Sequence, residues 1–281
     1  MRVSRTFILI LLVASPAFSH PGIGIVRNSK GAIFYTDLKH VWKLAPNGAK
    51  SIAVHNVHTH ELWIDADDNL YGEHLWYEGD ATGKWGYRVW RLSLDGTLSD
   101  IIPARRGFRE DYGDFFFVHD RNGAMYWADR GDTTAIKKRF PDGTTVVVVR
   151  LKFQDVRWMT VTPEGTIYLV DLYDLVRVTT DGSVKILAKN IADWKWTRLL
   201  GPDRHAIMGL WTDAQENVYA AVLSGNVVKK ISPAGVVGVF YRSPSPWSPT
   251  GGLVAPNGEV WILEYAGNNV RVRRVSATSI P

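Results

Sequence analysis

Histidines and carboxylates gather in one short stretch of this chain. His58 and His60 are followed directly by Glu61, and His74 lies on the next predicted strand. Side chains two positions apart on a strand point the same way, so the imidazoles of His58 and His60 are expected to lie together. Imidazole and carboxylate groups are common metal ligands. We predict a divalent metal site, with calcium, zinc or copper as candidate ions, at His58, His60, His74 and Glu61. The alternative is that these are polar strand ends bonded to backbone.

Further ionisable residues recur at comparable places along the chain. Asp129 and Asp171 each end a predicted strand, and Arg157 begins one. A metal at the histidine cluster would polarise a substrate carbonyl and activate a bound water. Glu61, Asp129 or Asp171 would then be the general base, and Arg157 would orient an anionic group. These residues predict a metal-dependent hydrolase or lyase. The chain contains no cysteine and no Gly-x-Ser-x-Gly elbow that would indicate a nucleophilic enzyme.

Aromatic and arginine side chains are concentrated in the predicted long loops. Aromatic faces stack on sugar rings, and arginines bind carboxylates or phosphates. We therefore predict a small-molecule or carbohydrate ligand. The candidate binding residues are Trp76, Tyr77, Trp85, Arg109, Trp194 and Trp247. The alternative is that long loops use such residues to pack on themselves.

The elements that must position these residues come from a repeated pattern of strand, tight turn and strand. The six turns are centred on Gly31, Asp68, Gly123, Gly165, Glu216 and Gly258. A repeat of about forty residues, rich in strands, is typical of a propeller. Most units carry a second hairpin with Asn-Gly or Asp-Gly at its turn. We predict an all-β, six-bladed β-propeller of four-stranded antiparallel blades, a single domain over residues 20–281. The sixth unit has only three evident strands.

The first nineteen residues predict a secretory signal peptide. Arg2 and Arg5 precede an apolar run, and Ala17-Phe18-Ser19 is a small-x-small cleavage site. We therefore expect a periplasmic or secreted protein without a membrane anchor. Removing two arginines lowers the formal charge from +5 to 5 − 2 = +3. The basic residues are dispersed, so nucleic acid is not expected as a partner, and we expect a monomer.

The phrase Gly31-Ala-Ile-Phe-Tyr-Thr-Asp37, followed by Val41-Trp-Lys-Leu-Ala-Pro-Asn-Gly48, resembles the NHL repeat and the six-bladed propellers of the SMP-30/gluconolactonase group. The resemblance implies a divalent cation at the channel mouth and a lactone substrate. Glu61 is similar to a metal-binding glutamate of the lactonases. The asparagine-glycine pair of a later lactonase blade is replaced here by Met208-Gly209 and Thr250-Gly251.

Three functions are therefore compatible with the sequence. The first is a hydrolase or lyase acting on a sugar-derived lactone or uronate-like substrate. The second is a non-catalytic propeller that binds a glycan, peptide or protein, because one fold hosts many activities. The third is a copper oxidase with a histidine brace, which requires His20 to be the mature N-terminus and a second histidine to complete the site.

Overall fold

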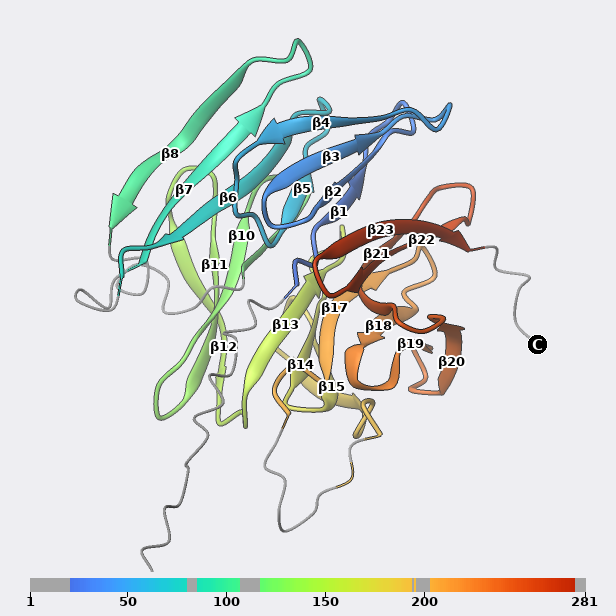
Figure 1. Cartoon of the computed structure of the whole chain (residues 1–281). Helices are drawn as coiled ribbons and strands as arrows, with labels where there is room; N and C mark the ends of the chain where they lie inside the picture. Colours follow the sequence, from blue (N-terminus) through green and yellow to red (C-terminus); the bar gives the residue numbers. More distant parts are fainter. Residues whose placement is uncertain (1–20, 80–84, 107–116, 194, 196–202, 276–281) are drawn as a thin grey trace, which may run out of the picture.

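The computed structural model describes residues 21–79, 85–106, 117–193, 195 and 203–275, and in these ranges it is built from antiparallel sheets around a common centre (Figure 1). The first blade contains β1 (Ile25–Arg27), β2 (Ile33–Thr36), β3 (His40–Leu44) and β4 (Lys50–His55). The second contains β5 (Leu62–Ile64), β6 (Leu70–Tyr77), β7 (Trp85–Leu92) and β8 (Leu98–Arg106). The third contains β9 (Phe117–His119), β10 (Met125–Asp129), β11 (Thr134–Arg139) and β12 (Thr145–Leu151).

The remaining blades follow the same order. The fourth contains β13 (Val156–Val161), β14 (Ile167–Asp171), β15 (Asp174–Val178) and β16 (Val184–Ala188). The fifth contains β17 (Ile207–Thr212), β18 (Val218–Val222), β19 (Val227–Ile231) and β20 (Val237–Arg242). The sixth contains β21 (Ser248–Val254), β22 (Val260–Ala266) and β23 (Asn269–Val275), so this sheet has three strands within the described residues. The predicted all-β, six-bladed propeller is confirmed.

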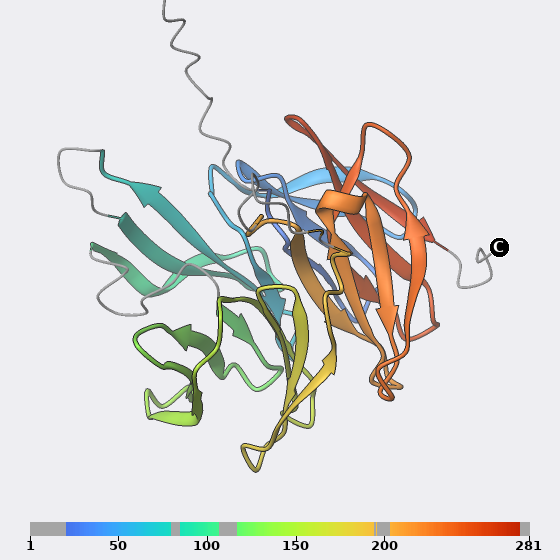
Figure 2. The same ribbon diagram turned by 90° about the horizontal axis from the view of Figure 1, so that it is seen from below.

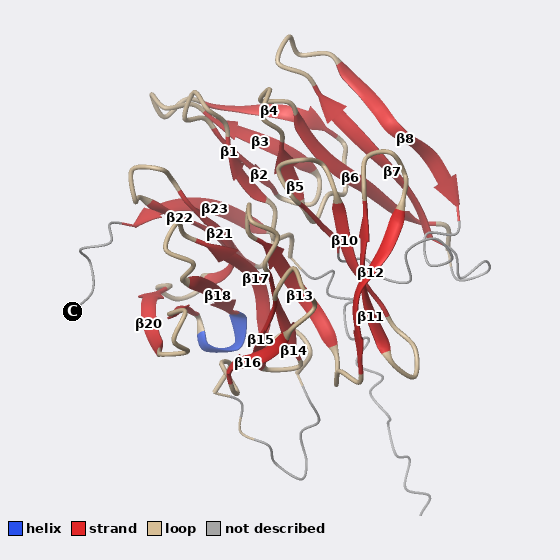
Figure 3. Ribbon diagram, turned by 180° about the vertical axis from the view of Figure 1, so that it is seen from behind, coloured by secondary structure: helices blue, strands red, loops and turns tan. Residues whose placement is uncertain are grey.

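The described ranges are almost entirely strand and turn (Figure 3). Their helical content is the 3-10 turn Leu223–Gly225, and no helix there is long enough to cross a bilayer. Each sheet runs outward from its first strand in simple sequence order. Successive strands are antiparallel, so the entries to all the first strands lie at one end of the propeller.

The turns between first and second strands share one hydrogen-bonding pattern in three blades. The carboxylate of Asp65 accepts the backbone N–H groups of Asp67 (3.0 Å) and Asn69 (2.8 Å), and the hydroxyl of Tyr71 (2.8 Å). The equivalent pairs in the third and fifth blades are Asp120 with Tyr126 and Asp213 with Tyr219. An aspartate that bonds the backbone two residues on favours a tight turn, and the tyrosine ties this turn to the second strand.

The innermost strands of neighbouring blades approach each other at glycines. A Cβ atom on Gly24 would lie 2.9 Å from the backbone nitrogen of Leu62, and one on Gly209 would lie 2.5 Å from the carbonyl oxygen of Thr250. A Cβ on Gly251 would overlap the carbonyl oxygen of Ile23. Strands β17, β21, β1 and β5 therefore follow one another with nearly direct backbone contact, which only glycine permits at these points.

The ring closes by packing the sixth blade against the first (Figure 2). Leu263 and Tyr265 of β22 share an apolar cluster with Ile25, Ile33 and Tyr35 of the first blade. The hydroxyl of Tyr265 also donates to the carbonyl oxygen of Thr36 at 3.0 Å. The first and last blades are thus joined by side-chain packing and the close approach at Gly251.

We expect Gly251→Ala to destabilise the propeller by about 1–3 kcal/mol, because the new methyl group must push β21 away from β1. Gly238→Ala is the matched control, since nothing lies within 4 Å of a Cβ built there. The control should change the free energy of unfolding by no more than about 0.5 kcal/mol. Urea titrations followed by tryptophan fluorescence measure both values. Equal stability of the two variants would contradict this account of ring closure.

Candidate functional site

The entry to β5 is held by a buried carboxylate from the neighbouring strand. Glu73 on β6 is 1% exposed, and its Oε1 accepts the backbone N–H groups of His60 and Glu61 (3.1 Å for the latter). Its Oε2 has no hydrogen-bond partner among the described residues. A buried carboxylate oxygen without a donor costs free energy. Glu73 therefore fixes the backbone that presents His60 and Glu61 to the centre, while retaining an unsatisfied oxygen.

Glu61 lies between this carboxylate and the third blade. Its Oε1 accepts the backbone N–H of His119 at 3.2 Å, and its Oε2 lies 3.8 Å from His119 Nδ1 with no hydrogen-bond partner among the described residues. Burial, and next the charge of Glu73, raise the pKa of Glu61 well above its usual value. Glu61 therefore keeps its proton at pH values where an exposed glutamate is ionised.

Two imidazoles complete this group of buried ionisable residues. His119 is stacked on the indole of Trp63, with ring centroids 3.6 Å apart, and burial lowers its pKa to about 3. The ring is therefore neutral at physiological pH. His60 Nδ1 lies 3.7 Å from Glu73 Oε1. We call Glu61, Glu73, His60 and His119 the buried acid–base cluster.

Sequence reasoning did not single out His119 or Glu73. His119 lies 58 residues after Glu61 and sits inside a strand of only three residues, so nothing in the local pattern links the two. Glu73 directly precedes His74, and the alignment of strand ends favoured the histidine. One signal could have indicated Glu73: it is a glutamate at a position where the strand pattern predicts a buried residue, and buried glutamates are rare unless they are paired.

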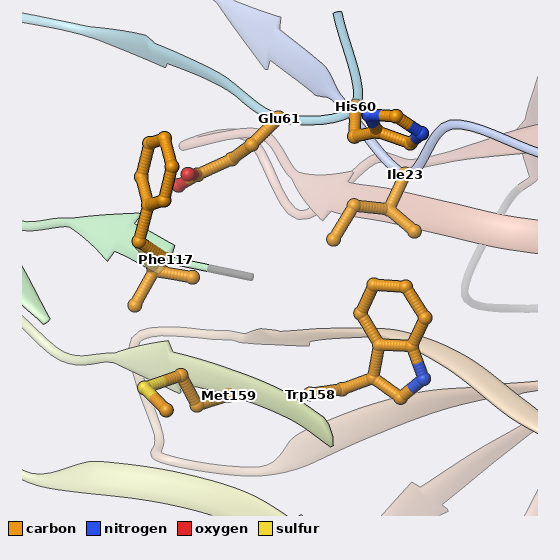
Figure 4. Close-up of a pocket in the computed structure, with 7 residues that line it drawn as sticks. Ile23, His60, Glu61, Phe117, Trp158 and Met159 are labelled. Atoms are coloured by element: carbon orange, nitrogen blue, oxygen red, sulfur yellow. The ribbon is translucent and has the colours of Figure 1, made fainter. Parts of the chain in front are cut away.

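Two members of the cluster open onto a small cavity at the centre of the ring (Figure 4). The cavity has a volume of about 10 Å³, enough for roughly one water molecule. Apart from His60 and Glu61 its lining is apolar: Ile23, Phe117, Val118, Trp158 and Met159. The carboxyl group of Glu61 points towards Phe117 across this space (Figure 4). The low polarity of the lining accounts for the retained proton of Glu61.

The four predicted metal ligands lie near one another but do not surround a common point. His74 Nδ1 accepts the backbone N–H of His58 at 2.8 Å, which takes up that nitrogen. The His58 ring packs edge-on against His60 at 4.7 Å, and burial and His60 together lower its pKa to about 4. Among the described residues no three His, Asp or Glu side chains are placed to hold a metal ion. The residues as arranged do not fit the divalent metal site that the sequence predicts.

The other predicted catalytic residues are bonded within their own blades. Asp129 is 39% exposed and pairs with Lys137 Nζ at 2.6 Å. Asp171 accepts the backbone N–H groups of Gln154 (2.6 Å) and Asp155 (2.8 Å), as Glu73 does in the second blade. Burial raises the pKa of Asp171. Neither aspartate joins the buried acid–base cluster.

Arg157 lies at the entry to β13, where its Nε donates to Asp155 Oδ2 at 3.0 Å. It therefore belongs to the same end of the propeller as Glu61, on a different blade. Its partners there are distinct from the buried acid–base cluster.

The predicted ligand-binding aromatics fall in two places. Trp76, Tyr77 and Trp85 lie together on the long β6–β7 hairpin, where the Tyr77 and Trp85 rings are 4.9 Å apart. Trp247 lies under the guanidinium of Arg271, 4.0 Å from its centre, near the sixth blade. Arg109 and Trp194 lie outside the described residues. So do His20, and with it the copper brace, and the predicted signal peptide 1–19.

No protein-family model matches this chain, and the search of curated proteins likewise found no match. Solved structures do match. A regucalcin from Agrobacterium tumefaciens, described as a calcium-binding protein, has a TM-score of 0.59 and 13% identity, covering 86% of this chain and 81% of its own. A gluconolactonase from Xanthomonas campestris has a TM-score of 0.59 and 12% identity, covering 89% and 84%. Virginiamycin B lyase from Staphylococcus aureus has a TM-score of 0.51 and 13% identity, covering 91% and 85%.

The chain is a six-bladed β-propeller that matches the gluconolactonase, regucalcin and virginiamycin B lyase structures. The predicted structural kinship with the SMP-30/gluconolactonase group is confirmed at the level of the fold. At such low identity the likeness carries the fold alone, so a catalytic or binding role must be argued from the residues of this chain.

The pKa of Glu61 makes a pH dependence of stability measurable. A carboxyl group whose pKa is raised by folding contributes stability below its unfolded pKa, 4.5, and loses it as pH rises through the folded pKa. We expect the free energy of unfolding of Glu61→Gln to fall less than that of wild type between pH 5 and 8. His119 acts in the opposite direction below pH 6.5, but it is present in both proteins.

Urea titrations across this pH range measure the difference, with Glu164→Gln as the control because Glu164 is exposed in a turn. Parallel pH profiles for wild type and Glu61→Gln would show that Glu61 ionises normally.

Proposed function

We propose that this chain is a hydrolase or lyase for a small sugar-derived lactone or uronate-like substrate, with Glu61 as its acid–base group. The observation that supports the proposal is a largely buried glutamate with an unpartnered Oε2 and a raised pKa, beside a cavity at the centre of the ring. Strongly perturbed carboxyl groups in such positions are typical of general acids. The same residue in an ordinary structural role would be expected to have both oxygens bonded.

Lactone hydrolysis requires two proton transfers, and Glu61 can take part in both. Water adds to the lactone carbonyl carbon, the ring C–O bond breaks, and the departing ring oxygen takes a proton. A neutral Glu61 can donate that proton, and its carboxylate can then accept the proton that the attacking water releases. In a lyase reaction a C–O bond and the neighbouring C–H bond break as a C=C bond forms; the departing oxygen takes the proton of Glu61, and the Glu61 carboxylate takes the proton released from carbon. Glu73 would hold the Glu61 backbone in place and favour its protonated form.

The place of substrate binding follows from the size of the cavity. The cavity itself holds about one water, the size of the attacking molecule rather than of the sugar. The substrate ring would therefore lie at the mouth, above the entries to β5, β9 and β13. The structural neighbours named as a gluconolactonase and a virginiamycin B lyase support an enzyme on this fold by analogy.

The setting of the proposed enzyme also rests on sequence. With the signal peptide over residues 1–19, the mature protein would act in the periplasm or outside the cell. N-terminal sequencing of protein exported from cells tests the cleavage site.

A second function is favoured by the aromatic residues of the second blade. Tyr77 is 44% exposed and packs beside Trp85, while Trp76 stacks on His74 with ring centroids 5.7 Å apart. Strands β6 and β7 that carry them are eight residues each, longer than the corresponding strands of the other blades. Exposed aromatic rings on an extended hairpin are suited to stacking on sugars. The alternative function is therefore a non-catalytic carbohydrate-binding propeller.

We expect Glu61→Gln to lose about 10²–10⁴-fold in kcat on aldonolactones or unsaturated uronates, because glutamine cannot donate the proton. The measurement is hydrolysis or elimination across a panel of both substrate classes. Glu164→Gln, with an exposed glutamate changed in the same way, should retain wild-type turnover. Retention of full turnover by Glu61→Gln, or no turnover by wild type on either class, would contradict the proposal.

For the carbohydrate-binding alternative, Tyr77→Ala and Trp85→Ala should each weaken oligosaccharide binding by up to about tenfold, since stacking on an aromatic ring contributes roughly 0.5–1.5 kcal/mol. Titration calorimetry with neutral oligosaccharides measures this, and Glu61→Gln should bind like wild type. If neither aromatic substitution changes the affinity, the aromatic rings of the β6–β7 hairpin do not form the oligosaccharide-binding site.

A further inference from the structure

We propose that Arg157 and Arg204 form a binding site for the carboxylate of a small sugar acid at the mouth of the propeller. The inference deepens the proposed function only in naming the ligand class. The site itself is inferred from groups that the catalytic argument does not use. It lies at the entries to β13 and β17, on the fourth and fifth blades.

The two guanidinium groups converge on a single carboxylate oxygen. Asp155 Oδ2 accepts Arg157 Nε at 3.0 Å and lies 3.3 Å from Arg204 Nε. Each arginine uses only its Nε in this contact. Two cations therefore share one anion in contact, which leaves a positive charge for a further anion to balance.

The Nη groups of both arginines are left available. Within the described ranges, no hydrogen bond or ion pair engages an Nη atom of Arg157 or of Arg204. The Arg157 side chain is only 16% exposed, whereas that of Arg204 is 60% exposed. Although the Arg157 side chain is mostly buried, its Nη atoms are not fully enclosed, so an acceptor from outside can reach them. The paired Nη atoms of an arginine match the two oxygens of a carboxylate.

The backbone around Arg157 is fixed before any ligand arrives. The buried Asp171 accepts the backbone N–H groups of Gln154 and Asp155, which fixes the backbone that carries the Asp155 side chain. From the third blade, Arg130 Nε donates to the Val156 carbonyl oxygen at 3.1 Å. A site whose donors are held in advance loses less entropy on binding.

The neighbouring titratable groups are compatible with an anionic ligand. His205 lies close enough for the Arg157 charge to lower its pKa, after burial, so its ring is neutral. Asp203 accepts the His205 backbone N–H at 2.9 Å, and Asp174 accepts that of Asn190 at 2.8 Å. These two carboxylates are engaged with backbone, and Asp155 is the acid in contact with the guanidinium pair in the described residues.

The position of the site explains why a sugar acid is the favoured ligand class. Trp158 and Met159, the next residues of β13, line the central cavity beside Glu61 (Figure 4). A carboxylate held by Arg157 and Arg204 would therefore place the rest of a small molecule over the cavity mouth. The planar fork of arginine favours a carboxylate held by two hydrogen bonds over an uncharged hydroxyl.

The test is titration calorimetry on the protein without its predicted signal peptide. The four ligands are D-gluconate, D-galacturonate, uncharged methyl glucoside and inorganic phosphate. We expect at least one sugar acid to bind saturably and methyl glucoside not to bind at this site. Arg157→Gln and Arg204→Gln should each weaken the sugar acid on the order of tenfold. Arg157→Lys keeps the charge and should still weaken binding, because it loses the fork. Arg88→Gln is the matched control, since Arg88 pairs with Asp100 on the second blade.

Each outcome decides the inference separately from the proposed function. Glu61→Gln should bind the sugar acid like wild type while its turnover is lost. Absence of saturable binding of both sugar acids, binding of phosphate alone, or undiminished affinity in correctly folded Arg157→Lys and Arg204→Gln would overturn the carboxylate site. Any of these results with normal wild-type turnover would leave Glu61 as the proposed acid. Thermal melts of each variant show whether it is folded.

Discussion

The ring of six blades depends on the close approach of the innermost strands of neighbouring blades at a few glycines. Gly24, Gly209 and Gly251 let neighbouring backbones meet where any side chain would collide. This brings β17, β21, β1 and β5 into contact and closes the ring between the sixth and first blades, where Tyr265 is bonded to Thr36. Since the sixth sheet has three strands in the described residues, closure rests on this packing. The small, apolar centre beside Glu61 is a consequence.

A second feature occurs in two blades: a carboxylate on the second strand accepts two successive backbone N–H groups at or just before the first strand. Asp171 accepts those of Gln154 and Asp155, and Glu73 accepts those of His60 and Glu61. In the fourth blade the carboxylate holds the backbone, and in the second blade it lies beside the proposed acid Glu61. In the second blade a further acid, Glu61, stands at the capped entry. Two carboxyl groups near each other in an apolar centre cannot both ionise cheaply, so one keeps its proton.

The same feature positions the proposed carboxylate site in the fourth blade. There the backbone held by Asp171 carries Asp155 and Arg157 at the entry to β13, and Arg204 joins them from the entry to β17. One geometry thus places an acid group and a cationic group at the same end of the propeller. Variation at the capped entries, on a constant framework, is how one fold can host different functions.

The repeats and their six turns could be predicted from the sequence, and three strands of the last unit were evident in it, as in the described residues. These features depend on local causes, namely the alternation of apolar residues and the backbone preferences of Gly, Asn and Asp. His58 and Glu61, which the sequence groups together, lie just before and at the entry to β5. Sequence alone could not show that His74 uses its Nδ1 to hold the His58 backbone, because this bond depends on how β6 lies beside the loop before β5.

Tertiary structure decided which strand-end side chains meet. A shift of one residue moves a side chain to the other face of a strand. His74 stands at the position of Asp171 and, like it, accepts a backbone N–H before the first strand, whereas Glu73 reaches the N–H groups of His60 and Glu61. The irregular register between Val156 and Met159 places both Trp158 and Met159 at the cavity. His119 reaches Glu61 only because the third blade packs beside the second. Such contacts between distant segments depend on packing and register, and repeat spacing alone carries neither.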